Sequence, residues 1–224
     1  MRIPERMIWR VPPTRSAPVR DPDPLAPRGQ SVDAARGPSL GPSLDPSPVA
    51  RGRRRWTRVG VAVEPPGDGP PSRVRYQWDA DTELLVASIG DRRNGGAAAA
   101  SLELEGADGS WLTIELRAGR FCGLEVAVWP PVRLRTAVEP PLATEPGHVS
   151  VPELLALGAT TDVEVDTQLV VEADRQRRTY HFRLGRSRPT RAVRVGRDIL
   201  LDVDEDGDLA GLWLLNVPAQ PLPH

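Results

Sequence analysis

Two stretches of the chain repeat the same order of glycines, turns and alternating apolar residues. Asp79 and Gly90 recur 95 positions later as Asp174 and Gly185. Four more residues recur 88 positions later, namely Gly119, Gly123, Leu124 and Pro130, as Gly207, Gly211, Leu212 and Pro218. A β unit of about 60 residues is only marginally stable alone. The repeat therefore predicts two related antiparallel β units that form a pseudo-symmetric pair.

Short alternating segments predict the strands of both units. In the first unit, residues 74–78 and 84–89 flank an acidic turn, as the strands of a hairpin do. The first unit has a surplus of seven residues, which we assign to a loop at 94–100. In the second unit, the alternation of apolar residues from Val163 to Val171 predicts one strand. The remaining strands are expected at 59–63, 101–105, 111–116, 122–129, 178–184, 191–195, 199–203 and 209–217.

Composition divides the chain into five parts. The first 50 residues hold eleven of the twenty-five prolines and cannot bury enough apolar surface to offset their ordering entropy. Early assignment of the start codon in a GC-rich genome is an alternative origin for this segment. The fold class is mainly β, with α+β as the alternative. The parts are a disordered tail (1–56), a first β repeat (57–131), a proline-rich bridge with a short helix (132–161), a second β repeat (162–218) and a C-terminal tail (219–224).

The one predicted helix lies in the bridge between the repeats. Ser150 and Glu153 have the S-x-x-E spacing of a capping box. Leu154, Leu155 and Leu157 would supply its buried face. The helix is therefore expected to span two turns at most and to end at Gly158.

Residue usage excludes several kinds of chemistry. All twenty-nine basic residues are arginine, so the chain has no lysine for a Walker-type phosphate loop or a Schiff base. We interpret this composition as bacterial. Cys122 is the single cysteine and cannot form an intrachain disulfide. No apolar run reaches the length of a signal peptide or membrane span, which indicates a cytoplasmic protein with no membrane contact. We expect no cofactor and identify no catalytic residues.

An arginine cluster marks the end of the N-terminal tail. Residues 1–58 have twelve arginines and five acids, whereas the rest has seventeen arginines and twenty-five acids. Such a basic segment can fold back on the acidic body or contact an anionic partner. Arginines beside an aromatic ring could hold phosphates and stack on a base. The candidate nucleic-acid contacts are Arg51, Arg53, Arg54, Arg55, Trp56 and Arg58.

An acidic run near the C-terminus is the candidate metal site. Asp202, Asp204 and Asp206 match alternate positions of a calcium-binding loop, and Asp208 follows them. Trp213 occupies the position that requires a bidentate carboxylate, and strands flank the run where helices are needed. The favoured interpretation is a hairpin turn in which Asp206 and Gly207 adopt positive φ. His181 is expected on the solvent face of a strand.

Three segments resemble the small bacterial YuzE-like proteins. Residues 78–86 resemble the opening hairpin of that family, in which an aromatic-Asp pair precedes an acidic turn. Residues 202–212 are similar to its closing hairpin, and residues 123–126 match its last strand in the first repeat. Trp213 replaces a glutamate of the pattern. The resemblance implies tandem, diverged copies of that fold and supplies no mechanism, because the family is functionally uncharacterised.

Three functional hypotheses are consistent with these observations. The first is a non-catalytic scaffold or protein-interaction module whose exposed sheet edges or long loop receive a protein partner. The second is a nucleic-acid-associated regulatory protein that uses the basic tail. The third is an enzyme whose catalytic groups come from distant strands and are not visible in sequence. The sequence leaves the oligomeric state and the packing of the two repeats open.

Overall fold

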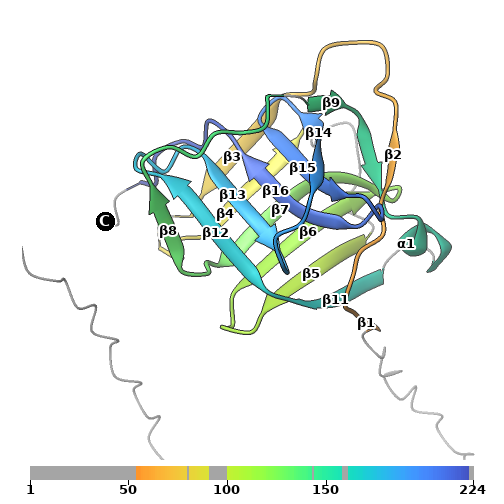
Figure 1. Cartoon of the computed structure of the whole chain (residues 1–224), viewed down its shortest axis with the longest axis horizontal. Helices are drawn as coiled ribbons and strands as arrows, with labels where there is room; N and C mark the ends of the chain where they lie inside the picture. The colour runs from red at the N-terminus through yellow and green to blue at the C-terminus, as the bar shows by residue number, and fades with distance from the viewer. Residues whose placement is uncertain (1–53, 80, 91–99, 143, 158–160, 222–224) are drawn as a thin grey trace, which may run out of the picture. The chain divides into compact units, whose positions relative to one another are not determined.

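The computed structural model describes residues 54–79, 81–90, 100–142, 144–157 and 161–221, which belong to one compact unit. These residues form sixteen strands and one short helix. The strands make two sheets that pack face to face (Figure 1). The predicted fold class, mainly β with two related antiparallel units and one short helix, is confirmed.

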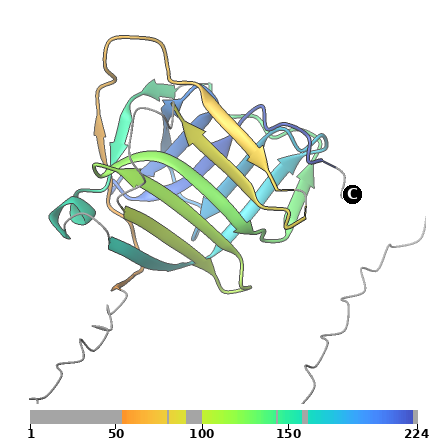
Figure 2. The same ribbon diagram turned by 180° about the vertical axis from the view of Figure 1, so that it is seen from behind.

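The first sheet has nine strands. Their order is β1-β11-β5-β6-β7-β10-β2, and β4 also pairs with β7 and carries β3 at its far side (Figure 2). The strands are β1 (Arg54–Trp56), β2 (Ala62–Glu64), β3 (Val74–Trp78), β4 (Leu85–Ile89), β5 (Ala100–Gly106), β6 (Trp111–Arg117), β7 (Arg120–Val128), β10 (His148–Ser150) and β11 (Thr161–Thr167).

The second sheet has seven strands in the order β8-β12-β13-β16-β15-β14-β9. These are β8 (Val132–Arg135), β9 (Thr144–Pro146), β12 (Leu169–Asp174), β13 (Tyr180–Leu184), β14 (Thr190–Gly196), β15 (Ile199–Asp204) and β16 (Leu209–Leu214).

Strand pairing in the two sheets follows the repeat. Ala87 pairs with Leu124 between β4 and β7, and Phe182 pairs with Leu212 between β13 and β16. These positions differ by the 95 and 88 residues read from the sequence. The five strands β3-β4-β7-β6-β5 of the first sheet therefore correspond to β12-β13-β16-β15-β14 of the second.

The surplus of the first repeat is spread over several turns. Leu102 pairs with Ile114 in the first sheet, and Val193 pairs with Leu201 at the equivalent place in the second. β14 is therefore displaced from β5 by 91 residues, and β15 is displaced from β6 by 87 residues. Four surplus residues thus lie between Ala87 and Leu102, and four lie in the β5–β6 hairpin between Leu102 and Ile114. The β6–β7 hairpin is one residue shorter than its counterpart. Assigning the whole surplus to 94–100 was wrong, because the β5–β6 hairpin is also longer than its counterpart. Most of that predicted loop lies outside the described residues.

A glycine on β7 and its counterpart on β16 let neighbouring strands approach closely. A Cβ atom at Gly123 would lie 2.7 Å from a backbone oxygen of β4, and one at Gly211 would lie 2.6 Å from a backbone oxygen of β13. A carboxylate of the adjacent strand also lies over each glycine, Glu115 in the first sheet and Asp202 in the second. Both positions therefore require glycine, which explains why these residues persist in the repeat.

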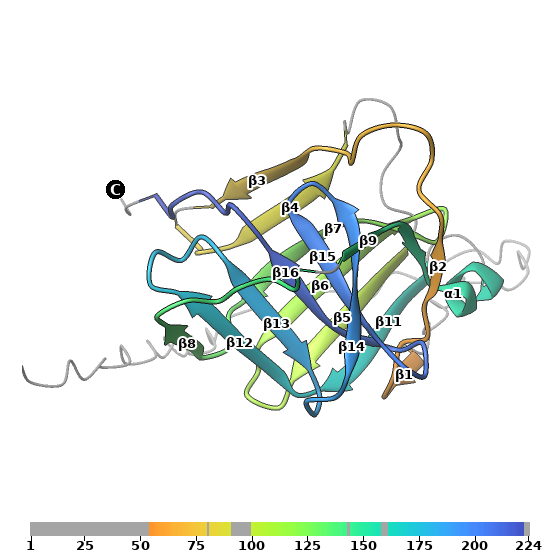
Figure 3. The ribbon, with the colours of Figure 1, turned by 45° about the horizontal axis from the view of Figure 1, so that its top comes forward.

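The bridge predicted at 132–161 contains strands that are shared between the sheets. β8 and β9 pair at opposite edges of the second sheet, whereas β10 and β11 join the first. The chain between β8 and β9 therefore crosses the outer face of the second sheet (Figure 3). The predicted single strand from Val163 to Val171 was also wrong. It divides at Gln168, where the chain passes from β11 in one sheet to β12 in the other.

The helix forms where the capping box predicts it. α1 spans Pro152–Leu157 and has Glu153 in its first turn. Leu154 is buried, but Leu155 is 53% exposed, so only part of the predicted apolar face packs on the sandwich. Adjacent residues of a helix point about 100° apart, which explains why the neighbour of a buried leucine faces solvent.

The chain termini partly correct the predicted tails. Residues 54–56, assigned to the disordered tail, form β1, because the chain pairs in parallel with β11 and Trp56 packs against the core. Residues 1–53 and 222–224 lie outside the described residues.

An apolar core fills the space between the sheets. The largest fully buried side chains come from both repeats, and each contributes about 1.5–3 kcal/mol relative to exposure. They are Phe182, Leu85, Leu102, Leu104, Leu112, Ile114, Leu116, Leu124, Leu154, Ile199 and Leu201. Leu200 is equally buried but belongs to a separate cluster on the outer face of the second sheet. At one end of the sandwich, the Trp129 ring centroid lies 5.7 Å from that of Trp78 and 5.1 Å from that of Tyr180. This aromatic cluster joins the two repeats.

Candidate functional site

The acidic run forms the hairpin turn between β15 and β16. The Asp204 carboxylate accepts hydrogen bonds from the backbone N–H groups of Asp206 (3.0 Å) and Asp208 (2.7 Å). Gly207 has a φ of +83°. The turn is thus as expected, except that Asp206 does not share the positive φ, because the three-residue loop needs this conformation at its last position only. One carboxylate organises the backbone of the whole turn.

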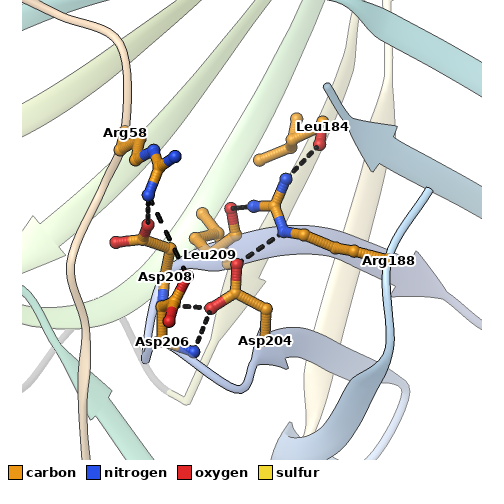
Figure 4. Close-up of polar contacts among 7 residues, drawn as sticks. All are labelled: Arg58, Leu184, Arg188, Asp204, Asp206, Asp208 and Leu209. Atoms are coloured by element: carbon orange, nitrogen blue, oxygen red, sulfur yellow. Dashed lines mark hydrogen bonds and ion pairs between the residues drawn. The ribbon is translucent and has the colours of Figure 1, made fainter. Parts of the chain in front are cut away.

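Asp204 is buried and contacts a partly exposed arginine from the β13–β14 loop. The Arg188 Nε atom lies 2.5 Å from Asp204 Oδ2, and the carboxylate side chain is 7% exposed (Figure 4). The same guanidinium donates hydrogen bonds to the backbone oxygens of Leu184 (3.4 Å) and Leu209 (3.3 Å). A buried carboxylate needs such charge-assisted partners to offset its desolvation. Arg188 therefore connects the acidic turn to β13 and β16.

Asp202 lies on the outer face of the second sheet in a cluster of three side chains. His181 Nε2 lies 2.9 Å from Asp202 Oδ2, and the Trp213 indole N–H donates to Asp202 Oδ1 at 3.0 Å. The imidazole stacks on the indole with ring centroids 3.9 Å apart. His181 lies on the predicted outer face of β13, but the Trp213 ring covers one side of the imidazole and leaves its side chain only 20% exposed.

The four aspartates are held by different partners. Asp202 bonds to His181 and Trp213, Asp204 bonds to Arg188, and Asp206 and Asp208 lie near Arg58. Among the residues that the structure describes, no group of three or more His, Cys, Asp or Glu side chains is placed to hold a metal ion. The geometry of the turn matches a structural role for these carboxylates.

The described part of the basic cluster contacts the acidic body of the same chain. Arg55 lies 3.5 Å from Glu164 and 3.3 Å from Asp166 on β11. Arg58 lies 3.6 Å from Asp208 and 4.0 Å from Asp206 (Figure 4). Arg54 and Trp56 are part of β1, whereas Arg51 and Arg53 lie outside the described residues. This arrangement matches the expectation that a basic segment can fold back on an acidic body.

A strand from the bridge docks on the edge of the second repeat. β8 pairs with β12 in parallel, with Val132 opposite Val171 and Arg135 opposite Asp174. The Arg135 guanidinium also donates to the Glu172 carboxylate at 2.7 Å, and this hydrogen bond lowers the pKa of Glu172. The edge of the second repeat thus holds an extended segment of opposite charge.

Sequence reasoning missed this docked strand and the partners of the acidic turn. The alternation of apolar and basic residues at 132–135 was the available signal for β8, but the prolines on either side concealed it. Arg188 had no signal, because its contact with Asp204 depends on the packing of two loops. Trp213 was seen as a departure from a pattern, and its role follows only from its place beside Asp202.

Two further findings bear on function. The helix within the described residues has neither the length nor the apolarity needed to cross a membrane. The chain matches no protein-family model, and no curated protein is significantly similar to it.

Proposed function

We propose that the chain is a non-catalytic protein-interaction module that binds extended segments at the edges of its sheets. The supporting observation is that these edges accept short parallel strands from the chain itself. β8 docks on β12, and β9 docks on β14, where Arg191 lies 2.8 Å from Glu145. Strand addition of this kind is a common mode of peptide recognition, since backbone hydrogen bonds supply affinity and side chains supply specificity.

The use of the polar side chains also supports a non-catalytic role. The His181–Asp202 pair is packed against Trp213, and Asp204 is bound by Arg188 and by the turn that it organises. General acid–base chemistry needs groups that can reach a bound substrate. These side chains instead hold neighbouring strands together.

Site-specific photocrosslinking of the full chain in a bacterial host tests this function. A photoreactive residue would replace Gln77 on β3, Leu134 on β8 or Glu145 on β9. Each of these strands is an outermost described strand of its sheet. The control position is Arg175, which is exposed in the β12–β13 turn. We expect discrete protein adducts from at least one edge position and none from Arg175. Absence of adducts at all three edge positions would contradict the proposal.

Nucleic-acid binding is the competing function. Arg55 and Arg58 remain 63% and 73% exposed in their ion pairs, so an anionic polymer could still reach them. Replacing all five arginines of the cluster (Arg51, Arg53, Arg54, Arg55 and Arg58) with serine would then abolish salt-sensitive binding of RNA or DNA. Unchanged binding, or no binding by either form at low salt, would exclude this function.

A further inference from the structure

The outer edges of the two repeats differ in one respect. β12 at the edge of the second repeat is covered by β8. Its counterpart in the first repeat is β3, and among the described strands β3 pairs only with β4. Figure 3 shows β3 as the outermost strand on its side of the first sheet. The fold therefore has one occupied edge and one equivalent edge for which no described segment supplies a strand.

The backbone of β3 is oriented to accept a strand. The Gly90 N–H donates to the Arg73 oxygen, and the Asp79 N–H donates to the Leu84 oxygen, so odd-numbered residues of β3 bond to β4. In an antiparallel pair the intervening residues direct both backbone groups to the opposite side. The N–H and C=O groups of Val74, Tyr76 and Trp78 accordingly face the open edge.

The occupied edge fixes the expected register. Val171 and Ala173 on β12 lie opposite Val132 and Leu134 of the docked strand. The displacement of 95 residues that relates β12 to β3 places Tyr76 and Trp78 at these two positions. A strand that binds β3 in the same way would run parallel to it and place apolar residues opposite Tyr76 and Trp78.

The charges at the two edges have opposite signs. On β12 the acid Glu172 receives Arg135 from the docked strand. On β3 and just before it, Arg75 and Arg73 are exposed. Both also line a hollow of about 470 Å³ at the end of the β3–β4 hairpin, together with Ser72, Val74 and Gly90. The exposed Arg197 lies next to them, since its backbone N–H donates to the Ser72 oxygen at 2.9 Å. Charge complementarity therefore favours an acidic strand at this edge.

The equivalent segment of this chain is poorly suited to the open edge. The displacement of 88 residues that relates Pro130 to Pro218 makes residues 220–223 the counterparts of β8. Pro221 and Pro223 fall within these four positions and have no backbone N–H to donate. A regular parallel ladder on β3 therefore needs a segment other than residues 220–223.

We propose that the open edge of β3 binds an extended acidic peptide in parallel orientation, with alternate apolar and acidic residues. The inference rests on the proposed interaction function and names its site and partner chemistry. Backbone hydrogen bonds to Val74, Tyr76 and Trp78 hold the peptide, and Arg73 and Arg75 select its charge. The apolar side chains of the peptide extend the face that β3 packs toward the core.

Hydrogen exchange of the full chain with two synthetic peptides tests this site. The first probe is the nine-residue peptide Ser-Glu-Val-Glu-Val-Glu-Val-Glu-Ser, and the second has arginine in place of each glutamate. We expect the acidic probe to slow exchange at the Val74, Tyr76 and Trp78 amides at least tenfold, with no slowing by the basic probe. Equal protection by both probes, or protection at another edge instead, would overturn the inference.

A charge-reversed variant and a matched control sharpen the test. The double variant R73E/R75E is expected to bind the acidic probe at least tenfold more weakly. The control R175E/R186E changes the net charge equally at exposed positions in the β12–β13 turn and the β13–β14 loop and should alter binding less than twofold. Equal loss in both variants would show that only net charge matters and would overturn the inference.

Other occupants of the edge give different results. Protection of β3 amides that rises with protein concentration without peptide would assign the edge to a second copy of the chain. Protection that disappears on deletion of residues 219–224 would assign it to the C-terminal segment. Either result would overturn the inference. Protein crosslinks at Leu134 or Glu145 would then leave the proposed function standing, whereas the absence of crosslinks at every edge would remove both.

Discussion

In the first sheet β6 buries alternate side chains, whereas its counterpart β15 in the second sheet buries all six. The difference lies on the outer faces. Leu200 and Trp213 of the second sheet form a small apolar cluster with Ala192, and Val138 from the crossing segment packs against it. The positions that correspond to Leu200 and Trp213 in the first sheet are Thr113 and Glu125, which are only half-buried.

The two repeats therefore share one strand order but present different outer surfaces. The bridge covers the second sheet on its outer face and on its β12 edge. The first sheet has an alternating outer face, and no described segment adds a strand to its β3 edge. Covering a sheet buries polar groups, which must then find partners. Asp202 and Asp204 meet this requirement through Trp213, His181 and Arg188. We infer that the covered sheet supplies stability and the open sheet is available for binding.

Removing the indole of the covered face should give the largest effect. The variant W213A takes away the ring that packs on Ala192 and Leu200 and leaves the buried Asp202 without its indole donor. Loss of a buried tryptophan costs about 3–5 kcal/mol of unfolding free energy. Urea unfolding measures this loss, and E125A, at the equivalent position of the first sheet, should cost less than about 1 kcal/mol. Equal losses in both variants would contradict the difference between the faces.

The ion pair between the buried Asp204 and the partly exposed Arg188 should give the second-largest effect. The variant D204N weakens the acceptor of two backbone N–H groups and leaves Arg188 without a counter-charge. Hydrogen bonds to charged groups contribute about 1.5–3 kcal/mol each, and we expect a loss of about 2–3 kcal/mol because Arg188 keeps some contact with solvent. A double-mutant cycle with R188Q measures the coupling. Additive losses would show that Asp204 serves the turn alone.

The sequence predicted the repeated part of this fold better than the connections. The glycines and turns fixed the correspondence of five strands, because Gly123 and Gly211 are each required by a neighbouring backbone oxygen. The alternation of apolar residues from Val163 to Val171 continues from β11 into β12 in the same phase. It therefore gave no sign that the chain passes from one sheet to the other between these two strands. Charged contacts such as that of Arg188 depend on loop packing, which periodicity does not encode.

Acid should loosen the covered edge before the rest of the sheet. The hydrogen bond from Arg135 lowers the pKa of Glu172, so the ionised carboxylate favours the docked state. The stabilisation of docked β8 by Glu172 is complete above the ordinary glutamate pKa of about 4.3. It is lost as the pH falls through the lower pKa that Glu172 has in the folded state. After correction for intrinsic rates, the β8 amides should exchange a few-fold faster relative to β15 amides at pH 3 than at pH 6. The variant E172Q should abolish this pH dependence, and its persistence would contradict a role for Glu172.

The exposed ion pairs of the basic segment should give the smallest effect. Arg58 contacts the same acidic turn as Arg188, but its side chain is 73% exposed and its nearest carboxylate oxygen lies 3.6 Å away. Exposed pairs of this kind contribute about 0.2–1 kcal/mol and weaken with salt. The variant R58A should therefore lose less than about 1 kcal/mol of unfolding free energy at low salt and almost nothing in 1 M NaCl. A salt-independent loss comparable to that of D204N would mean that the N-terminal segment is part of the stabilising cover of the second sheet, and Arg58 would then no longer be available to a nucleic acid.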